Sequence, residues 1–498
     1  MGFCFWGDFL KERGNKRMSD AQRQSRFERG EEVVVMKFGG TSVEDAAALK
    51  RLIGIVESRW GAHPVIVVSA LAKVTDQLLE AGKAAATGHL GAALALVRNI
   101  YVRHEELADS LLGASAYGSL DRELRNEFQS LESLLLALET SRHFDLKAQD
   151  HLLSFGECFS SKLVSWVLSE AGLQAAHVDA RQSIVTDARH GQATPVWDVT
   201  NQRLRDAVNP LLQSGSIPVM GGFIASSQNG VPTTLGRGGS DFSAAIVGAA
   251  IGALRIEIWT DVDGVMTTDP QLCSDARVIR KLSFDEAADM AYFGAKVLHP
   301  ATVAPAMREN IPVYVLNSRR PEGHGTEITA RASTGNRVSA ITAKRNVVSV
   351  EIQSRNGVDA AFLNTVFGVL EQHTCAVDVM GTSVDRISLL VASSDALPRI
   401  VEDLQPLAEV RWENHKAVIC LIGENIRRQP EVASRVFATV ADMDVRVLCQ
   451  GASERTLSFL VDESKAEESV RRLHSAFFPK VEPALDWGGI SSAFCQAG

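Results

Sequence analysis

From residue 33 onward the chain alternates short apolar runs with longer amphipathic segments. The runs that predict strands lie at residues 33–38, 64–70, 216–223, 255–261 and 311–317. Continuous apolar strands separated by helices are typical of a parallel sheet that is covered on both faces. The pattern therefore predicts an α/β fold with a mainly parallel sheet between helices.

Helical spacing dominates two further stretches. Residues 154–172 place Phe155, Phe159 and Leu163 on one face, and Gly172 follows as a stop signal. Residues 90–150 predict helices alone, as an insertion beside the sheet.

The C-terminal part contains an internal repeat. Residues 366–391 align without a gap with residues 436–461 and are identical at eight of 26 positions. Each unit predicts a helix, two strands and a helix, and a strand precedes it at 347–353 or 417–422. The gapless register favours two related α+β modules over a chance likeness of two amphipathic hairpins.

Residues 318–345 are rich in Gly, Ser, Thr and Arg and lack a sustained period, which indicates a domain boundary. The expected organisation is a polar N-terminal tail (1–32), the α/β domain (33–320), a linker (321–345), a first module (346–416), a second module (417–480) and a C-terminal tail (481–498).

Composition narrows the class of protein. With 498 residues, 45% hydrophobic and 22% charged, the chain is long enough for two or three folded domains. The net charge of −9 argues against a nucleic-acid or membrane-surface role for the whole chain. The seven cysteines lack metal-ligand spacing, so we expect reduced thiols in a cytoplasmic protein, with no disulfide and no zinc. The aromatic residues 1–10 are too short for a signal sequence or a membrane span, so no membrane segment is expected.

The junction "KFGGTS" at residues 37–42 joins a strand to a helix. Its glycine pair permits a sharp turn, and Thr41 or Ser42 is expected to cap the helix, with Asp45 completing a capping box from Ser42. A helix N-terminus beside Lys37 suits a phosphate group. A plain strand-to-helix turn with a surface lysine explains the motif equally well.

A second junction of the same kind is "TTLGRGGSDFSAA", residues 233–245. Arg237 offers a planar fork that suits a carboxylate. Asp241 is a candidate to orient Lys37 or to bind a metal, although it is equally suited to cap the helix that follows. Two such junctions in one sheet predict two ligands.

Other polar residues are weak signals when taken singly. Glu157 lies in the first turn of an apolar helical stretch, where it complements the helix dipole without any further role. Asp261 or Asp263 is a candidate metal or ribose ligand, and Lys296 is a candidate phosphate ligand; each is more often part of a solvated turn or face.

The motifs "KFGGTSV", "SFGE", "TTLGRGGSD", "WTDVDGV", "TTDP" and "FGAKVLHP", in this order and followed by paired modules, resemble the aspartate kinases over roughly residues 33–478. The resemblance is nearest to monofunctional bacterial enzymes inhibited by lysine. It implies an amino-acid-kinase fold followed by two ACT domains. It further implies that ATP with Mg²⁺ phosphorylates L-aspartate to 4-phospho-L-aspartate, the first step of lysine, threonine and methionine biosynthesis.

The resemblance also implies roles for single residues. Lys37 would stabilise the transferring phosphoryl group and Asp241 would organise Lys37. Arg237 would bind the α-carboxylate of aspartate and Glu157 its amino group. The substrate positions are Thr41, Ser42, Ser69, Ala70, Thr75, Glu157, Arg237, Gly238, Gly239 and Ser240. The nucleotide positions are Lys37, Gly39, Gly40, Thr260, Asp261, Met266 and Lys296. Met266 replaces a common tyrosine, and Gln271 replaces an arginine that often follows "TTDP".

The paired modules imply feedback regulation and a homodimer or homotetramer that forms through the ACT domains. The expected effector residues are Phe362, Leu363, Asp378 and Ser383. Lysine is the first choice of effector, threonine is the second, and loss of regulation is the third. Val384 stands where the lysine-sensitive pattern often has an acid, and Asp385 follows one position later.

Two other functions compete with this hypothesis. A non-catalytic amino-acid sensor would not need Lys37, Arg237, Asp241 and Lys296 together. A kinase of another acyl substrate, such as glutamate, is disfavoured by the pairing of Arg237 and Glu157 with regulatory modules.

Overall fold

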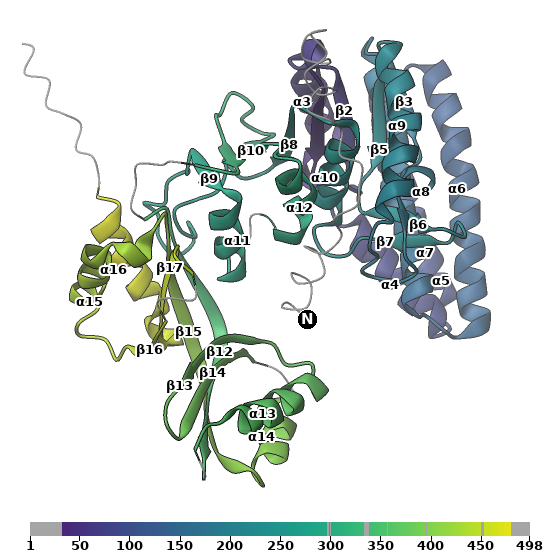
Figure 1. Cartoon of the computed structure of the whole chain (residues 1–498). Helices are drawn as coiled ribbons and strands as arrows, with labels where there is room; N and C mark the ends of the chain where they lie inside the picture. Colours follow the sequence, from purple (N-terminus) through teal and green to yellow (C-terminus); the bar gives the residue numbers. More distant parts are fainter. Residues whose placement is uncertain are drawn as a thin grey trace, which may run out of the picture. The chain divides into compact units, whose positions relative to one another are not determined.

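The computed structural model describes residues 32–295, 298, 300–332, 338–355, 357–393, 396–449 and 453–479. The chain divides into two compact units (Figure 1). The described parts of residues 1–266 and 277–339 form the first unit, and those of residues 267–276 and 340–498 form the second. No helix of the described chain is long and apolar enough to cross a lipid bilayer.

The first unit is built on a mainly parallel sheet. Within the described residues its eight strands follow the spatial order β3 (Ala175–Val178), β5 (Ile217–Gly221), β2 (Pro64–Val68), β1 (Val34–Phe38), β8 (Arg255–Thr260), β10 (Val313–Asn317), β11 (Thr326–Thr329) and β9 (Lys281–Ser283). The pairs from β3 to β10 are parallel, and β11 runs antiparallel to β10. The five strands expected from the apolar runs are all present, so the predicted α/β class is confirmed.

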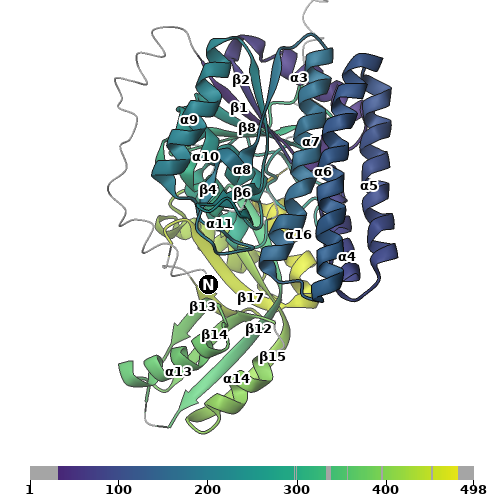
Figure 2. The same cartoon turned by 90° about the vertical axis from the view of Figure 1, so that its right-hand side faces the viewer.

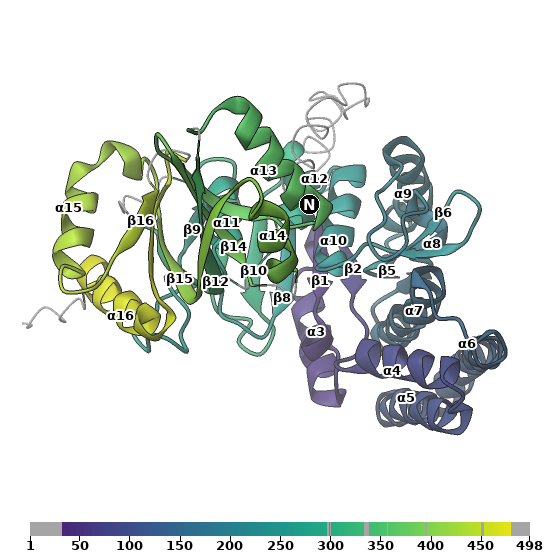
Figure 3. The same cartoon turned by 90° about the horizontal axis from the view of Figure 1, so that it is seen from below.

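Helices cover both faces of this sheet (Figure 3). One face carries α3 (Ala46–Glu57), α4 (Val74–Ala86), α5 (Leu90–Leu111), α6 (Ala114–Ser141) and α7 (Leu146–Glu170). Their apolar side chains share one core with Val34, Met36 and Phe38, the alternate residues of β1. The expected helical insertion at 90–150 is thus confirmed, and Figure 2 shows α4 to α7 side by side.

The opposite face carries α9 (Trp197–Gln213), α10 (Gly239–Ile251) and α12 (Pro300–Arg308). The remaining elements of this unit are η1 (Gly40–Ser42), η2 (Trp60–Ala62), α8 (Ala180–Ser183), α11 (Phe284–Tyr292) and a small sheet of β4 (Val185–Thr186), β6 (Ile224–Ser227) and β7 (Pro232–Thr234). Strand β7 leads directly into the turn that begins α10.

The second unit is a single antiparallel sheet with four helices among its described residues. The strand order is β13 (Val377–Thr382), β14 (Arg386–Ala392), β12 (Ala340–Ser354), β15 (Ala408–Ile422), β17 (Thr456–Asp462) and β16 (Arg446–Cys449). The helices are α13 (Ala360–Gln372), α14 (Leu397–Leu404), α15 (Pro430–Thr439) and α16 (Ala466–Phe477), with short turns η3 (Ile426–Arg428) and η4 (Glu463–Lys465).

Strands β12 and β15 are long because each serves both repeats. Residues 347–353 of β12 pair with β14 of the first module, whereas residues 340–344 pair with residues 418–422 of β15 in the second. Within the expected linker 321–345 the structure contains β11 and the first part of β12. The partner of residues 340–344 lies far along the chain, so local composition could not reveal this pairing.

Candidate functional site

The carboxyl ends of the parallel strands in the first unit meet at one edge of the sheet. Neighbouring chain segments stay hydrogen-bonded just beyond the strands. Gly39 N donates to Trp259 O at 3.1 Å, and Ser69 N donates to Phe38 O at 3.0 Å. Ligands of open parallel sheets bind at this edge, so these bonds bring the predicted residues after β1, β2 and β8 next to one another.

Lys37 and Asp241 form an ion pair at this edge. Lys37 Nζ lies 2.7 Å from Asp241 Oδ1, and the two side chains are 11% and 16% exposed. Lys37 is the penultimate residue of β1, and Asp241 lies in the first turn of α10. The two predicted junctions thus form one site, where the Asp241 carboxylate holds a nearly buried ammonium group.

Glycines let the backbone segments at this site approach closely. A Cβ on Gly40 would lie 2.8 Å from Ala70 O, and a Cβ on Gly222 would lie 2.7 Å from the Cβ of Ser240. Ser69 Oγ donates to Ser240 Oγ at 3.0 Å. The predicted residue Gly40 therefore contacts Ala70, and Ser69 contacts Ser240. Gly222 is a site residue that sequence reasoning missed.

Glu157 is buried on α7, with 3% of its surface exposed. Burial raises the pKa of its carboxyl to about 8, although a hydrogen bond from the backbone N–H of Ala70 and the charge of Lys37 act in the opposite direction. Its Oε2 has no hydrogen-bond partner among the described residues. A buried carboxylate oxygen without a donor is costly unless a cationic or donor group binds there.

Arg237 is exposed, between two glycines with left-handed backbone, Gly236 at φ 77° and Gly238 at φ 70°. Gly238 is the N-cap of α10, so the guanidinium belongs to the turn that opens this helix. No ion pair of Arg237 is present within the described part of the chain. A free guanidinium beside a helix N-terminus is suited to bind a carboxylate.

The helix cap of the first junction differs from the prediction. Asp45 alone is the N-cap of α3, and its side chain accepts a hydrogen bond from Ala48 N at 2.7 Å. Thr41 and Ser42 lie in the short turn η1, and Ser42 Oγ lies 2.8 Å from Ser318 Oγ. The predicted cap at Thr41 or Ser42 is therefore wrong, because the buried Ser42 hydroxyl is used between strand ends.

The predicted nucleotide residues lie at and after the end of β8. Thr260 Oγ1 donates to Asp261 Oδ1 at 3.3 Å, and Met266 is half-buried opposite Val278. Asp263 accepts a hydrogen bond from Asn317 Nδ2 at 2.7 Å, which ties the turn after β8 to β10.

Thr75 and Lys296 are the remaining predicted site residues. Thr75 lies half-buried in the first turn of α4. Lys296 lies outside the described residues. No cluster of three or more His, Cys, Asp or Glu side chains that could hold a metal ion occurs in the described ranges.

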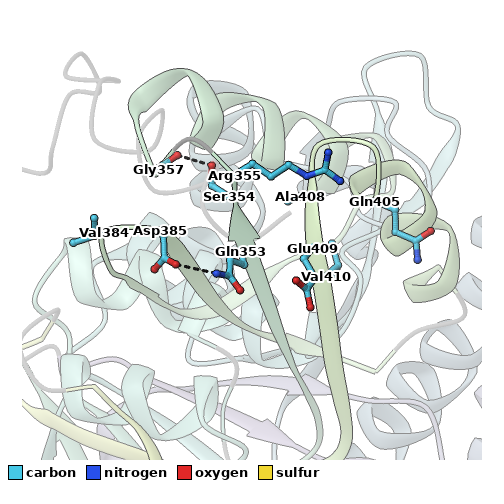
Figure 4. Close-up of a pocket in the computed structure, with 10 residues that line it drawn as sticks. All are labelled: Gln353, Ser354, Arg355, Gly357, Val384, Asp385, Gln405, Ala408, Glu409 and Val410. Carbon is cyan, nitrogen blue, oxygen red and sulfur yellow. Dashed lines mark hydrogen bonds between the residues drawn. The ribbon is translucent and has the colours of Figure 1, made fainter.

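The second unit contains an open cavity of about 990 Å³ at the end of β12 (Figure 4). Arg355, Asp385 and Glu409 contribute charges to its lining. Gln353 Nε2 donates to Asp385 Oδ2 at 3.0 Å and fixes this carboxylate in place.

The four expected effector residues lie outside this lining. Phe362 and Leu363 on α13 pack against the core of the first module. Asp378 on β13 forms a 2.7 Å ion pair with Lys344. Ser383 precedes Val384, which does line the cavity.

Comparisons with known proteins agree with this architecture. The model of the "Amino acid kinase family" matches residues 32–317, and an ACT domain model matches residues 419–477. The lysine-sensitive aspartokinase 3 of Escherichia coli is 35% identical over 458 residues, which cover 90% of this chain and 99% of the relative. Aspartokinase 2 of Arabidopsis thaliana, a chloroplastic protein, is 35% identical over 471 residues, which cover 89% of this chain and 84% of the relative.

Solved structures give the same result. E. coli aspartokinase III in complex with aspartate and ADP matches with a TM-score of 0.77 and 34% identity, and the match covers 90% of this chain and 100% of the other. The same enzyme in complex with lysine and aspartate matches with a TM-score of 0.75 and 34% identity, over 90% of this chain and 99% of the other. The chain therefore belongs to the amino acid kinase family and, within it, to the aspartokinases.

Proposed function

We propose that this aspartokinase transfers the γ-phosphoryl group of ATP to the β-carboxylate of L-aspartate, which yields 4-phospho-L-aspartate and ADP. The observation that carries the proposal is the 2.7 Å pairing of Lys37 with Asp241 at the sheet edge, in a unit where Glu157 and Arg237 lack ionic partners among the described residues. The complex of E. coli aspartokinase III with aspartate and ADP supports it.

The substrate is recognised through its two charged α-substituents. Arg237 binds the α-carboxylate with two parallel N–H donors. Glu157 accepts from the α-ammonium through Oε2, the oxygen that has no other partner among the described residues. Once the ammonium is bound, it favours the ionised form of Glu157 and lowers a pKa that burial had raised to about 8.

The β-carboxylate needs no general base, because a carboxyl group with a pKa near ~3.9 is already ionised at neutral pH. The main barrier is therefore the electrostatic repulsion between the β-carboxylate and the γ-phosphate as they approach each other. The positive charge of Lys37 stabilises the negative charge of the transferring phosphoryl group, and Asp241 keeps the Lys37 ammonium in position. Ser69 and Ser240 are joined by a 3.0 Å hydrogen bond, Ser240 directly precedes Asp241 in the chain, and the two hydroxyls would orient the acceptor.

The nucleotide is bound by the segment after β8. We assign this role to Thr260, Asp261 and Met266, together with Gly39, Gly40 and Lys296. Mg²⁺ would accompany ATP and neutralise part of the phosphate charge. Mg²⁺ at kinase sites is generally held by substrate phosphates together with one or two carboxylates, so the phosphate oxygens of ATP would supply most of its ligands here.

The second unit regulates the first by binding an amino acid. Lysine is the first candidate, because E. coli aspartokinase III has been crystallised with lysine; threonine is the second. Phe362, Leu363, Asp378 and Ser383 remain the proposed effector residues, and the charged cavity beside Ser383 offers an approach for a zwitterion. An effector inhibits only by binding the inactive arrangement more tightly than the active one.

The proposal includes a homodimer or homotetramer formed through the ACT modules, and a cytoplasmic location. Cys158, Cys273 and Cys420 are buried and form no disulfide within the described residues, in accord with a reducing compartment.

The experiment that tests the function is ATP-dependent formation of an acyl phosphate, trapped with hydroxylamine as the hydroxamate. Aspartate should give product, and glutamate should give little, because its longer side chain misplaces the carboxylate relative to Lys37. Equal rates would favour the runner-up, a kinase of another acyl substrate. Absence of any hydroxamate, with amino-acid binding retained, would favour a sensor.

A further inference from the structure

Helix α7 carries a second buried carboxylate besides Glu157. Asp150 lies seven residues earlier, on the same face of the helix, and is 1% exposed. A charged group is rarely buried so completely unless several donors satisfy it. The function of Asp150 therefore depends on the groups that hydrogen-bond to its carboxylate.

Asp150 joins two loops that are distant in sequence. Thr234 Oγ1, at the end of β7, donates to Oδ1 at 2.5 Å. Gly191 N donates to both oxygens, at 3.1 and 2.9 Å, and His190 Nδ1 lies 2.8 Å from Oδ2. One carboxylate thus fixes the end of β7 and the loop around residue 190.

These two loops also contact each other directly beside Arg237. Ala193 N donates to Thr234 O at 2.9 Å. A Cβ on Gly236 would lie only 3.2 Å from Gly191 O, so the two backbones are packed together there. Arg237 is the next residue after Gly236, in a turn with left-handed glycines on both sides and no ion pair of its own among the described residues. Its position therefore depends on the flanking backbone.

We propose that Asp150 is a positioning residue for the substrate, because it holds the 233–238 turn so that Arg237 meets the α-carboxylate. The inference rests on the proposed function and deepens it. Helix α7 then sets both contacts to the amino acid: Glu157 acts directly on the ammonium, and Asp150 acts through Arg237.

The test compares two substitutions with a matched control and a rescue variant. Asp150→Asn keeps one oxygen acceptor but turns an amide N–H₂ toward other donors, and Thr234→Val removes the 2.5 Å hydrogen bond. Thr233→Val is the matched control, because it removes a buried hydroxyl from the same strand whose partner is Thr186 at 2.7 Å.

Asp150→Asn and Thr234→Val should raise the KM for aspartate by about tenfold or more, as expected for the loss of a charge-assisted hydrogen bond, with the KM for ATP unchanged. Thr234→Ser should restore the KM, because it restores the hydroxyl. Thr233→Val should change neither KM. A merely structural role for Asp150 would instead lower activity with both KM values altered together or both unchanged.

A double-mutant cycle with Arg237→Ala tests whether Asp150 affects aspartate binding through Arg237. If Asp150 acts through Arg237, adding Asp150→Asn to Arg237→Ala should raise the aspartate KM no further. Multiplicative effects of the two substitutions would overturn the proposal.

Hydrogen exchange tests the inference without reference to activity. In Asp150→Asn and Thr234→Val, backbone amides of residues 188–193 and 235–240 should exchange faster than in wild type, and Thr233→Val should leave them unchanged. Unaltered exchange in both test variants would overturn the positioning role. A wild-type protein that fails to phosphorylate aspartate, with the predicted exchange pattern intact, would refute the proposed function and leave the anchoring of this turn established.

Discussion

Replacing Glu157 by glutamine should increase the stability of the folded protein and at the same time raise the KM for aspartate. In the folded protein, burial raises the pKa of Glu157 from 4.5 to about 8. At pH 7 the carboxyl is therefore protonated in the folded state and ionised in the unfolded state. The mismatch costs roughly 3 kcal/mol of folding free energy at pH 7, at about 1.4 kcal/mol per pH unit above the unfolded pKa. Glutamine is neutral at every pH and avoids this cost.

The sign of the pH dependence is specific. Because the folded-state pKa is the higher one, the contribution of Glu157 to stability is fully present below pH 4.5 and is lost progressively up to about pH 8. The Glu157→Gln variant should thus match wild type at low pH and become more stable than wild type as pH rises, with a constant difference above about pH 8. Thermal unfolding followed by fluorescence between pH 5 and 9, without ligands, measures this difference.

Glu257→Gln is the matched control. Glu257 is equally buried but accepts hydrogen bonds from Arg59 Nε at 3.0 Å and Arg255 Nε at 2.8 Å. Its replacement should destabilise the protein, because two guanidinium groups lose their counter-charge. Glu157→Gln should at the same time raise the KM for aspartate by about tenfold or more, since the ammonium loses its charged partner. A stability difference that does not grow with pH, or an unchanged KM, would refute the reasoning.

Three further predictions concern the same site. Lys37→Ala should lower turnover by about 10²–10³-fold, because the transferring phosphoryl group loses the positive charge that stabilises it, while circular dichroism shows an intact fold. Near-normal turnover would exclude this role of Lys37. Arg237→Lys should raise the KM for aspartate about tenfold and spare the KM for ATP, since a point charge cannot replace the planar fork, and a parallel rise in both constants would contradict this. The kcat/KM for aspartate should increase about tenfold per pH unit up to about pH 8, where Glu157 ionises, and Glu157→Gln should abolish this dependence; a flat wild-type profile would exclude the carboxyl as the ammonium ligand.

The pairing of the two charged junctions could be anticipated only in part from the sequence. Lys37 ends an apolar run that predicts a central strand, and Asp241 was a candidate to orient it. The second junction follows β7 of the small sheet, so tertiary folding alone brings Asp241 to Lys37, with their charged atoms 2.7 Å apart. The role of Glu157 could be predicted only from the family resemblance, because the sequence around it has the pattern of an ordinary apolar helix.

Other features depend on distant partners that local patterns do not reveal. Ser42 has the spacing of a helix cap, yet its hydroxyl lies 2.8 Å from that of Ser318, which is 276 residues away. Gly222 reads as part of a strand, and its need for glycine appears only when Ser240 packs against it. Asp150 carried no sequence signal, because its value comes from Thr234 and Gly191, which tertiary folding alone brings to it.

The central claim is that the β-carboxylate of aspartate attacks the γ-phosphorus of ATP beside Lys37. Aspartate labelled with ¹⁸O in its β-carboxylate tests this directly. Hydroxylamine cleaves the acyl phosphate at carbon, so the phosphate released should carry one ¹⁸O atom, detected by mass spectrometry. Unlabelled phosphate would show that water is the nucleophile and would contradict the account.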